Sequence, residues 1–170
     1  MLVRSAVFFK WLRYAAAAAV FFLLQDAILH RITIWGIIPF LYPLLAVIPA
    51  TYEGPAPGAV FALCLGVFCD ALLPDQFPCL YTLAFPLAGM IAGGLSRRVL
   101  PSGISCTVAA SAISFLLTDL LRCLLLWTSG KIVWSAALFL MLREYLVTLP
   151  LALPATWLFR TVHRKVHEND

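Results

Sequence analysis

Four ionisable side chains lie inside long apolar stretches of this sequence. Asp119 and Arg122 are three residues apart, so a helix presents them on one face. Arg143 and Glu144 are adjacent and point about 100° apart on a helix. Because a charge at the centre of a membrane helix costs about 2.5 to 3.5 kcal/mol, we expect crossed ion pairs, Asp119 with Arg143 and Arg122 with Glu144. Such pairs would lock two helices together. The alternatives are a polar docking site for a partner helix, a cavity for a solute, or an ion or proton relay.

A further acidic residue, Asp70, closes another apolar stretch, and Asp75 follows beyond Pro74. The carboxyl end of a helix carries a partial negative charge, which is the wrong end for a carboxylate. We therefore expect a neighbouring hydrogen-bond donor or cation beside Asp70, unless water solvates it.

The residue types that catalysis requires do not form a recognisable set. The histidines are His30, His163 and His167, and no Ser/His/Asp or Cys/His set falls on one membrane face. There is no glycine-rich phosphate loop and no H-E-x-x-H motif. The cysteines have no metal-ligand spacing and read as small buried apolar side chains: Cys64, Cys69, Cys79, Cys106 and Cys123. We expect no enzyme, no cofactor and no metal.

The elements that carry these residues are six apolar stretches. Over the whole sequence, 63% of the residues are hydrophobic and only 12% are charged. A soluble chain of 170 residues cannot cover that much apolar side chain. We predict an all-α integral membrane protein, a single domain of about six transmembrane helices. The predicted spans are residues 14–29, 34–50, 58–73, 80–95, 103–127 and 133–159.

Lysine and arginine alternate between the connections. The N-terminus, the connection after the fourth span and the C-terminal tail together carry eight of them, whereas the opposite connections carry only Arg31 and Lys131. The positive-inside rule then places both termini in the cytoplasm, with the first helix retained rather than cleaved as a signal peptide. This topology accounts for the net charge of +4 without a nucleic-acid partner.

Prolines and glycines shape the middle of the chain. Pro39, Pro43 and Pro49 interrupt the second span, which we expect to pack inside the bundle or to be bent and partly re-entrant. Residues 51–58 are expected to form a tight turn. Gly89 and Gly93 have the small-xxx-small spacing of a close helix contact, and Ala15 to Ala19 offer another small-residue surface.

This middle region, from Pro43 through Gly94, resembles the rod shape-determining protein MreD family. The features that match are the proline-broken span, the pattern Gly58-x7-Gly66-x3-Asp70 and the glycine-rich fourth span. One departure is Phe77-Pro78-Cys79, where that family usually has a glycine.

The resemblance implies a non-catalytic scaffold of the bacterial cell-elongation machinery (the elongasome) in the cytoplasmic membrane. Its implied partners are MreC, the MreB filament, the glycosyltransferase RodA and a transpeptidase, all serving cell shape and cell wall organisation. The family is similar in fold to the substrate-binding subunits of energy-coupling-factor vitamin transporters, which supplies the alternative function.

Overall fold

The computed structural model describes residues 2–73, 79–128, 130 and 134–167, and within them the chain is helical. The elements are α1 (Leu2–Ala27), η1 (Leu29–Arg31), α2 (Tyr42–Glu53), α3 (Pro55–Leu72), α4 (Leu80–Arg98), α5 (Ile104–Thr128), α6 (Trp134–Thr148), η2 (Leu149–Leu151) and α7 (Ala152–His167). An isolated bridge between Ile34 and Ile37 is the sole β contact among the described residues. The all-α prediction is confirmed.

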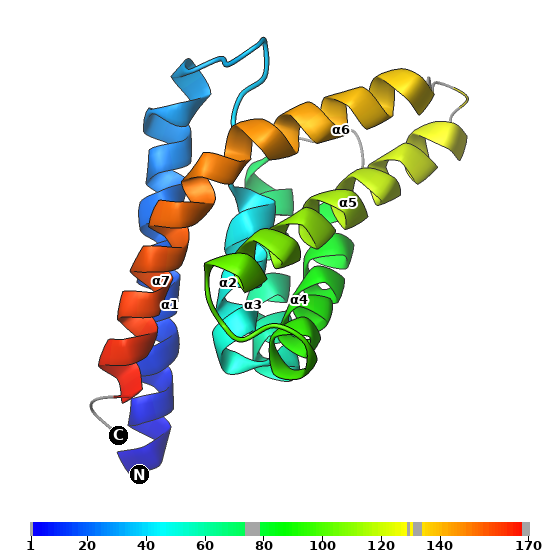
Figure 1. The fold of residues 1–170 in the computed structure, drawn as a ribbon. Helices are drawn as coiled ribbons and strands as arrows, with labels where there is room; N and C mark the ends of the chain where they lie inside the picture. Colours follow the sequence, from blue (N-terminus) through cyan, green and yellow to red (C-terminus); the bar gives the residue numbers. More distant parts are fainter. Residues whose placement is uncertain (1, 74–78, 129, 131–133, 168–170) are drawn as a thin grey trace.

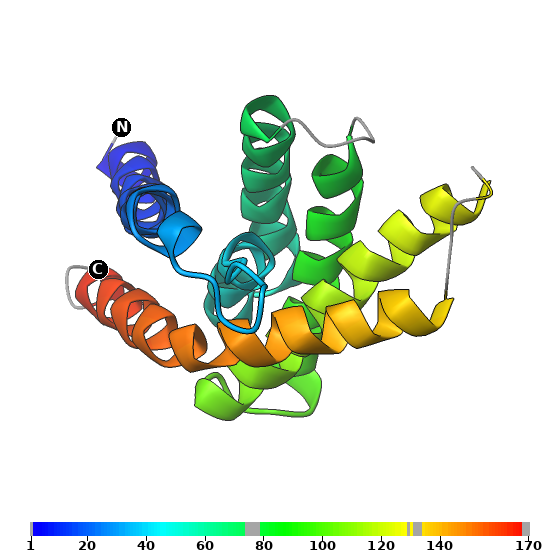
Figure 2. The ribbon, with the colours of Figure 1, turned by 90° about the horizontal axis from the view of Figure 1, so that it is seen from above.

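Helix α2 lies at the centre of the arrangement. It contacts α3, α4 and α5 on one side and α1 and α7 on the other (Figures 1 and 2). Helices α1 and α7 run side by side, and α6 crosses from the far end of α5 to α7 (Figure 1). Residues 42–51 of α2 are all buried, so this helix forms the core around which the others pack.

Helix α1 begins and α7 ends at the same end of the molecule, where the link between α2 and α3 and the loop between α4 and α5 also lie (Figure 1). We call this the basic end, because contacts with the end of α2 and between α1 and α7, together with the end of α4, bring most of the cations there: Lys10, Arg13, Arg97, Arg98, Arg160, Arg164 and Lys165. Its side of the membrane is a prediction from the positive-inside rule.

Four stretches of the described chain are long and apolar enough to cross a bilayer. They are Phe8–Arg31, Pro55–Leu72, Ile104–Thr128 and Leu138–Lys165, the last of which runs through α6, η2 and α7. No more than a third of the most apolar part of each stretch is buried, and large apolar side chains such as Val60, Leu120 and Leu153 point outward. Outward apolar faces of this extent indicate a lipid environment, so the chain has the structure of a membrane protein.

Two of the predicted spans are not continuous helices. Within residues 34–50 the helix begins only at Tyr42, because Pro39 and Pro43 lack N–H donors and disfavour helix in the residues before them. The resulting twelve-residue helix reaches about 18 Å, too short for a hydrocarbon layer of about 30 Å. The stretch 133–159 is broken between α6 and α7 at η2, which contains Pro150.

The turn predicted over residues 51–58 is much shorter. Helix α2 continues to Glu53 and α3 begins at Pro55, so Gly54 alone separates them. Its φ of 95° lies in the region that glycine tolerates.

The non-helical segment before α2 has its backbone satisfied by buried polar side chains. Gln25 of α1 donates to the Pro39 carbonyl at 2.7 Å and accepts from the Leu41 N–H at 3.1 Å. Thr148 accepts from the Phe40 N–H at 3.1 Å. Irregular backbone in a membrane protein needs such partners, and these bonds explain why Gln25 and Thr148 are buried.

Candidate functional site

Asp70 joins the carboxyl end of α3 to the amino end of α4. Its carboxylate accepts from the Tyr81 N–H at 3.1 Å, the Thr82 N–H at 2.8 Å and the Thr82 hydroxyl at 2.5 Å. The predicted neighbouring donors are therefore present, and they are the first N–H groups of a helix, where a negative charge is stabilised. Gly66 allows this approach, because a Cβ there would lie 2.5 Å from the Tyr81 carbonyl oxygen.

The other candidate glycines are also covered by the chain itself. A Cβ on Gly58 would lie 2.2 Å from the Ala50 Cβ of α2, and one on Gly93 would lie 2.5 Å from the Pro55 nitrogen. A Cβ on Gly89 would lie 3.1 Å from the Gly58 carbonyl oxygen. Thus α2, α3 and α4 meet at backbone contact distance, and these glycine faces are internal rather than open to a partner.

The prediction of an ion pair between Asp119 and Arg143 is wrong. Asp119 instead has Arg122 of its own helix at 3.9 Å, and Arg122 also donates to the Tyr81 hydroxyl at 2.9 Å. Arg143 donates to the Trp35 carbonyl of the segment before α2. The backbone turn at Trp35, which has a φ of 54°, supplies an acceptor that spacing along α5 and α6 cannot reveal.

Arg122 and Glu144 share a cavity of 290 Å³ at the end opposite the basic end. The cavity lies between α5, α6 and the segment before α2, and its other lining residues are Gly36, Ile37, Ile38, Phe40 and Leu140. One oxygen of the neighbouring Asp119 is buried without a hydrogen-bond partner among the described residues. The predicted charges therefore do gather in one place, beside a small open space.

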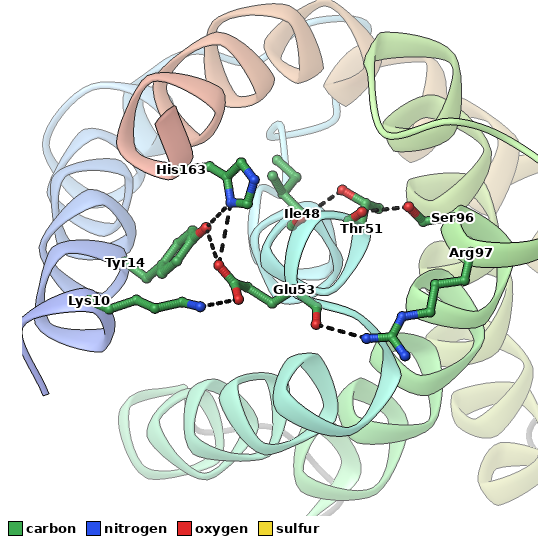
Figure 3. A network of polar contacts seen from close by, with 8 residues as sticks. All are labelled: Lys10, Tyr14, Ile48, Thr51, Glu53, Ser96, Arg97 and His163. Atoms are coloured by element: carbon green, nitrogen blue, oxygen red, sulfur yellow. Dashed lines mark hydrogen bonds and ion pairs between the residues drawn. The ribbon is translucent and has the colours of Figure 1, made fainter. Parts of the chain in front are cut away.

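A second polar cluster, which the sequence did not suggest, lies at the basic end and centres on Glu53 (Figure 3). Lys10 of α1 forms an ion pair with Glu53, and the Tyr14 hydroxyl donates to the same carboxylate at 2.9 Å. His163 Nδ1 of α7 lies 3.1 Å from the Tyr14 hydroxyl and 3.4 Å from Glu53 Oε1. Burial favours a higher pKa for Glu53, but the hydrogen bonds from Lys10 and Tyr14 and the Lys10 charge lower that pKa below its ordinary value.

Helix α4 completes this cluster from the other side of α2. Ser96 donates to the Thr51 carbonyl at 2.5 Å, and Arg97 donates to the Glu53 carbonyl at 3.4 Å (Figure 3). These carbonyls belong to the last turn of α2, which has no partners for them within its own helix. The polar end of α2 is thus held by α1, α4 and α7 together.

An apolar groove of 460 Å³ opens between α1 and α3. It is lined by Trp11, Ala15, Pro57, Val60, Phe61 and Cys64. The alanine run divides between two roles, because Ala17 and Ala18 are buried in the core whereas Ala15, Ala16 and Ala19 are exposed. One exposed alanine, Ala15, forms part of the groove wall.

No group of three or more His, Cys, Asp or Glu side chains in the described part of the chain has the geometry of a metal site. Comparison with protein-family models, with curated proteins and with solved structures finds no match to this chain.

Proposed function

We infer that this protein is a non-catalytic scaffold subunit of a bacterial cell-elongation complex, docking an MreC-like single-pass membrane protein. The observation that carries the proposal is the apolar groove between α1 and α3, which the chain leaves open, whereas it covers the glycine faces of α3 and α4 at Gly58, Gly66, Gly89 and Gly93. Helix association in lipid asks for close-packed small residues and few polar contacts, which Ala15 and Cys64 offer.

The resemblance to the MreD family supports the same proposal. Its pattern Gly58-x7-Gly66-x3-Asp70 corresponds to the helix α3, fixed to α4 by Asp70 and the close glycine contacts. That hairpin forms one wall of the groove, so the matching residues would hold the docking face in a fixed geometry. In this proposal the MreB filament, RodA and a transpeptidase join through the docked partner.

The test is a mild-detergent pull-down of the tagged protein from native membranes, with mass spectrometry of the proteins recovered. Ala15→Trp fills the groove, whereas Ala16→Trp adds the same side chain at an exposed position outside it. We expect an MreC-like partner with wild type and with Ala16→Trp, and at least tenfold less with Ala15→Trp. Equal recovery with both variants, or recovery of no single-pass partner, contradicts the proposal.

The cavity lined by Arg122 and Glu144 favours a second candidate, a vitamin-binding subunit of an energy-coupling-factor type transporter. Its volume of 290 Å³ lies at the lower limit of ligand sites, about 300 Å³, which makes this function second. Recovery of ATPase and coupling subunits, together with a small molecule lost on Arg122→Met, would favour it over the scaffold.

A further inference from the structure

A second pocket at the basic end lies between the end of α2, the loop before α5 and α7. It has a volume of 840 Å³ and is lined by Tyr52, Ser102, Trp157, Arg160, His163 and Arg164, with Thr161. Neither the scaffold function nor the Glu53 cluster uses this space. The inference below does not depend on the proposed function.

The charge of the pocket wall is positive. Arg160 and Arg164 are four residues apart, so α7 presents both on one face, and His163 adds an imidazole. No carboxylate belongs to the described residues that line the pocket. Among the described residues, Glu53 contacts His163 of this wall, and it is engaged by Lys10 and Tyr14. An anion is therefore the ligand that this wall would bind.

Tyr52 provides a hydrogen-bond donor for that anion. Its hydroxyl is buried and has no hydrogen-bond partner among the described residues. The ring is fixed by stacking on His163, with the centroids 5.1 Å apart. A buried hydroxyl without an acceptor is rare in a folded protein, and the pocket that Tyr52 lines is where an acceptor would lie.

The pocket opens where a lipid headgroup would lie. Trp157 is 71% exposed, although it lines the pocket, and it stands one helical turn before Arg160 near the end of the stretch Leu138–Lys165. Exposed tryptophan followed by arginine is typical of a helix crossing from hydrocarbon into the headgroup layer. Apolar Leu153, also exposed, continues this face of α7 toward the hydrocarbon.

We propose that this pocket binds the phosphate group of an anionic membrane lipid, with Arg160 and Arg164 on the phosphate oxygens and the Tyr52 hydroxyl donating to one of them. The planar guanidinium group binds phosphate with two parallel hydrogen bonds. Basic pockets between helices at the cytoplasmic surface suit such headgroups, and the acyl chains would lie along Trp157 and Leu153.

The test uses the full-length protein in nanodiscs of phosphatidylcholine with 10 to 30% phosphatidylglycerol, followed by native mass spectrometry of the lipids retained. Tyr52→Phe removes only the hydroxyl, and Arg160→Gln removes one guanidinium. Arg98→Gln is the matched control, an exposed arginine at the same end of the molecule outside the pocket. We expect about tenfold less retained phosphatidylglycerol with Arg160→Gln, about threefold less with Tyr52→Phe, and no change with Arg98→Gln.

Three results would overturn the proposal. Equal losses from Arg160→Gln and Arg98→Gln mean that surface charge alone attracts the lipid. Retention unchanged in both pocket variants means that the lipid binds elsewhere. Saturable binding of inorganic phosphate or glycerol 3-phosphate to the wild type, without selective lipid retention, assigns the pocket to a soluble phosphate compound. Equal unfolding midpoints of all variants in phosphatidylcholine alone would show that a loss of lipid reflects the pocket rather than the fold.

Discussion

Two adjacent glycines of α4 give a matched test of the close packing between α3 and α4. A Cβ on Gly93 would lie 2.5 Å from the Pro55 nitrogen and 2.6 Å from the Gly54 carbonyl carbon, whereas one on Gly94 meets nothing within 4 Å. Ordinary contacts between such atoms are about 3.5 to 4.0 Å, so Gly93→Ala must push α4 about 1 Å away from backbone that cannot yield locally.

Overpacking of this kind costs about 1 to 3 kcal/mol, and alanine in place of glycine returns up to about 1 kcal/mol of helix propensity. Gly94→Ala receives only the gain. We therefore expect Gly93→Ala to be about 2 kcal/mol less stable than Gly94→Ala, which corresponds to unfolding midpoints about 4 to 8 °C apart for a chain of this size. The measurement is thermal unfolding followed by circular dichroism in one detergent. Equal midpoints for the two variants would refute the backbone contact between Gly93 and Pro55.

Three further predictions concern the polar contacts. Asp70→Ala should lower stability by about 2 kcal/mol, since the first N–H groups of α4 lose their acceptor, and the melting midpoint checks it; an unchanged midpoint contradicts the capping role. Glu53→Gln should cost about 2 kcal/mol at neutral pH. The lowered pKa of Glu53 means that its stabilisation is complete above about pH 4.3 and lost as the pH falls through the folded value, so melting curves of wild type and variant should converge in acid, and Lys10→Met should show the same convergence. For Asp119 and Arg122, single neutralisation should destabilise by about 1 kcal/mol and the double Asp119→Asn, Arg122→Gln should recover part of the loss; additive losses would mean that the two groups are not coupled.

Asp70 and Glu53 show what local sequence can and cannot predict. The groups that donate to Asp70 lie 11 and 12 residues away, across a short connection between two helices. A carboxylate at the carboxyl end of a helix needs a nearby donor, so the local sequence is enough to predict one. The partners of Glu53 are 43 and 110 residues away. In the sequence, Glu53 is notable only as an acidic residue on the side of the chain whose other connections between spans are basic. No spacing rule links Glu53 to Lys10 or His163.

The same limit explains the wrong ion pair. Pairing the charges of α5 with those of α6 follows from two apolar stretches that are consecutive in the chain. The segment before α2, which the sequence presented as part of a span, instead reaches between them and offers the Trp35 carbonyl to Arg143. Once backbone leaves the helix, its own carbonyls compete with carboxylates for buried cations.

The interruption of the second predicted span, where the helix begins only at Tyr42, has a related cause. Hydropathy records that a side chain avoids water, but a helix buried among other helices and a helix facing lipid avoid it equally. Three prolines were the signal that separated the two cases, since an interrupted backbone needs protein partners that lipid cannot provide. Gln25 and Thr148 meet that need at the start of α2, and Glu53 with Ser96 and Arg97 anchors its other end. These partners come from α1, α4 and the α6–α7 region, so the position of α2 depends on helices from both ends of the chain. The core of this protein is therefore specified by polar contacts at the two ends of an apolar helix, and substitutions there should disturb the whole arrangement more than apolar substitutions on the lipid-facing surface.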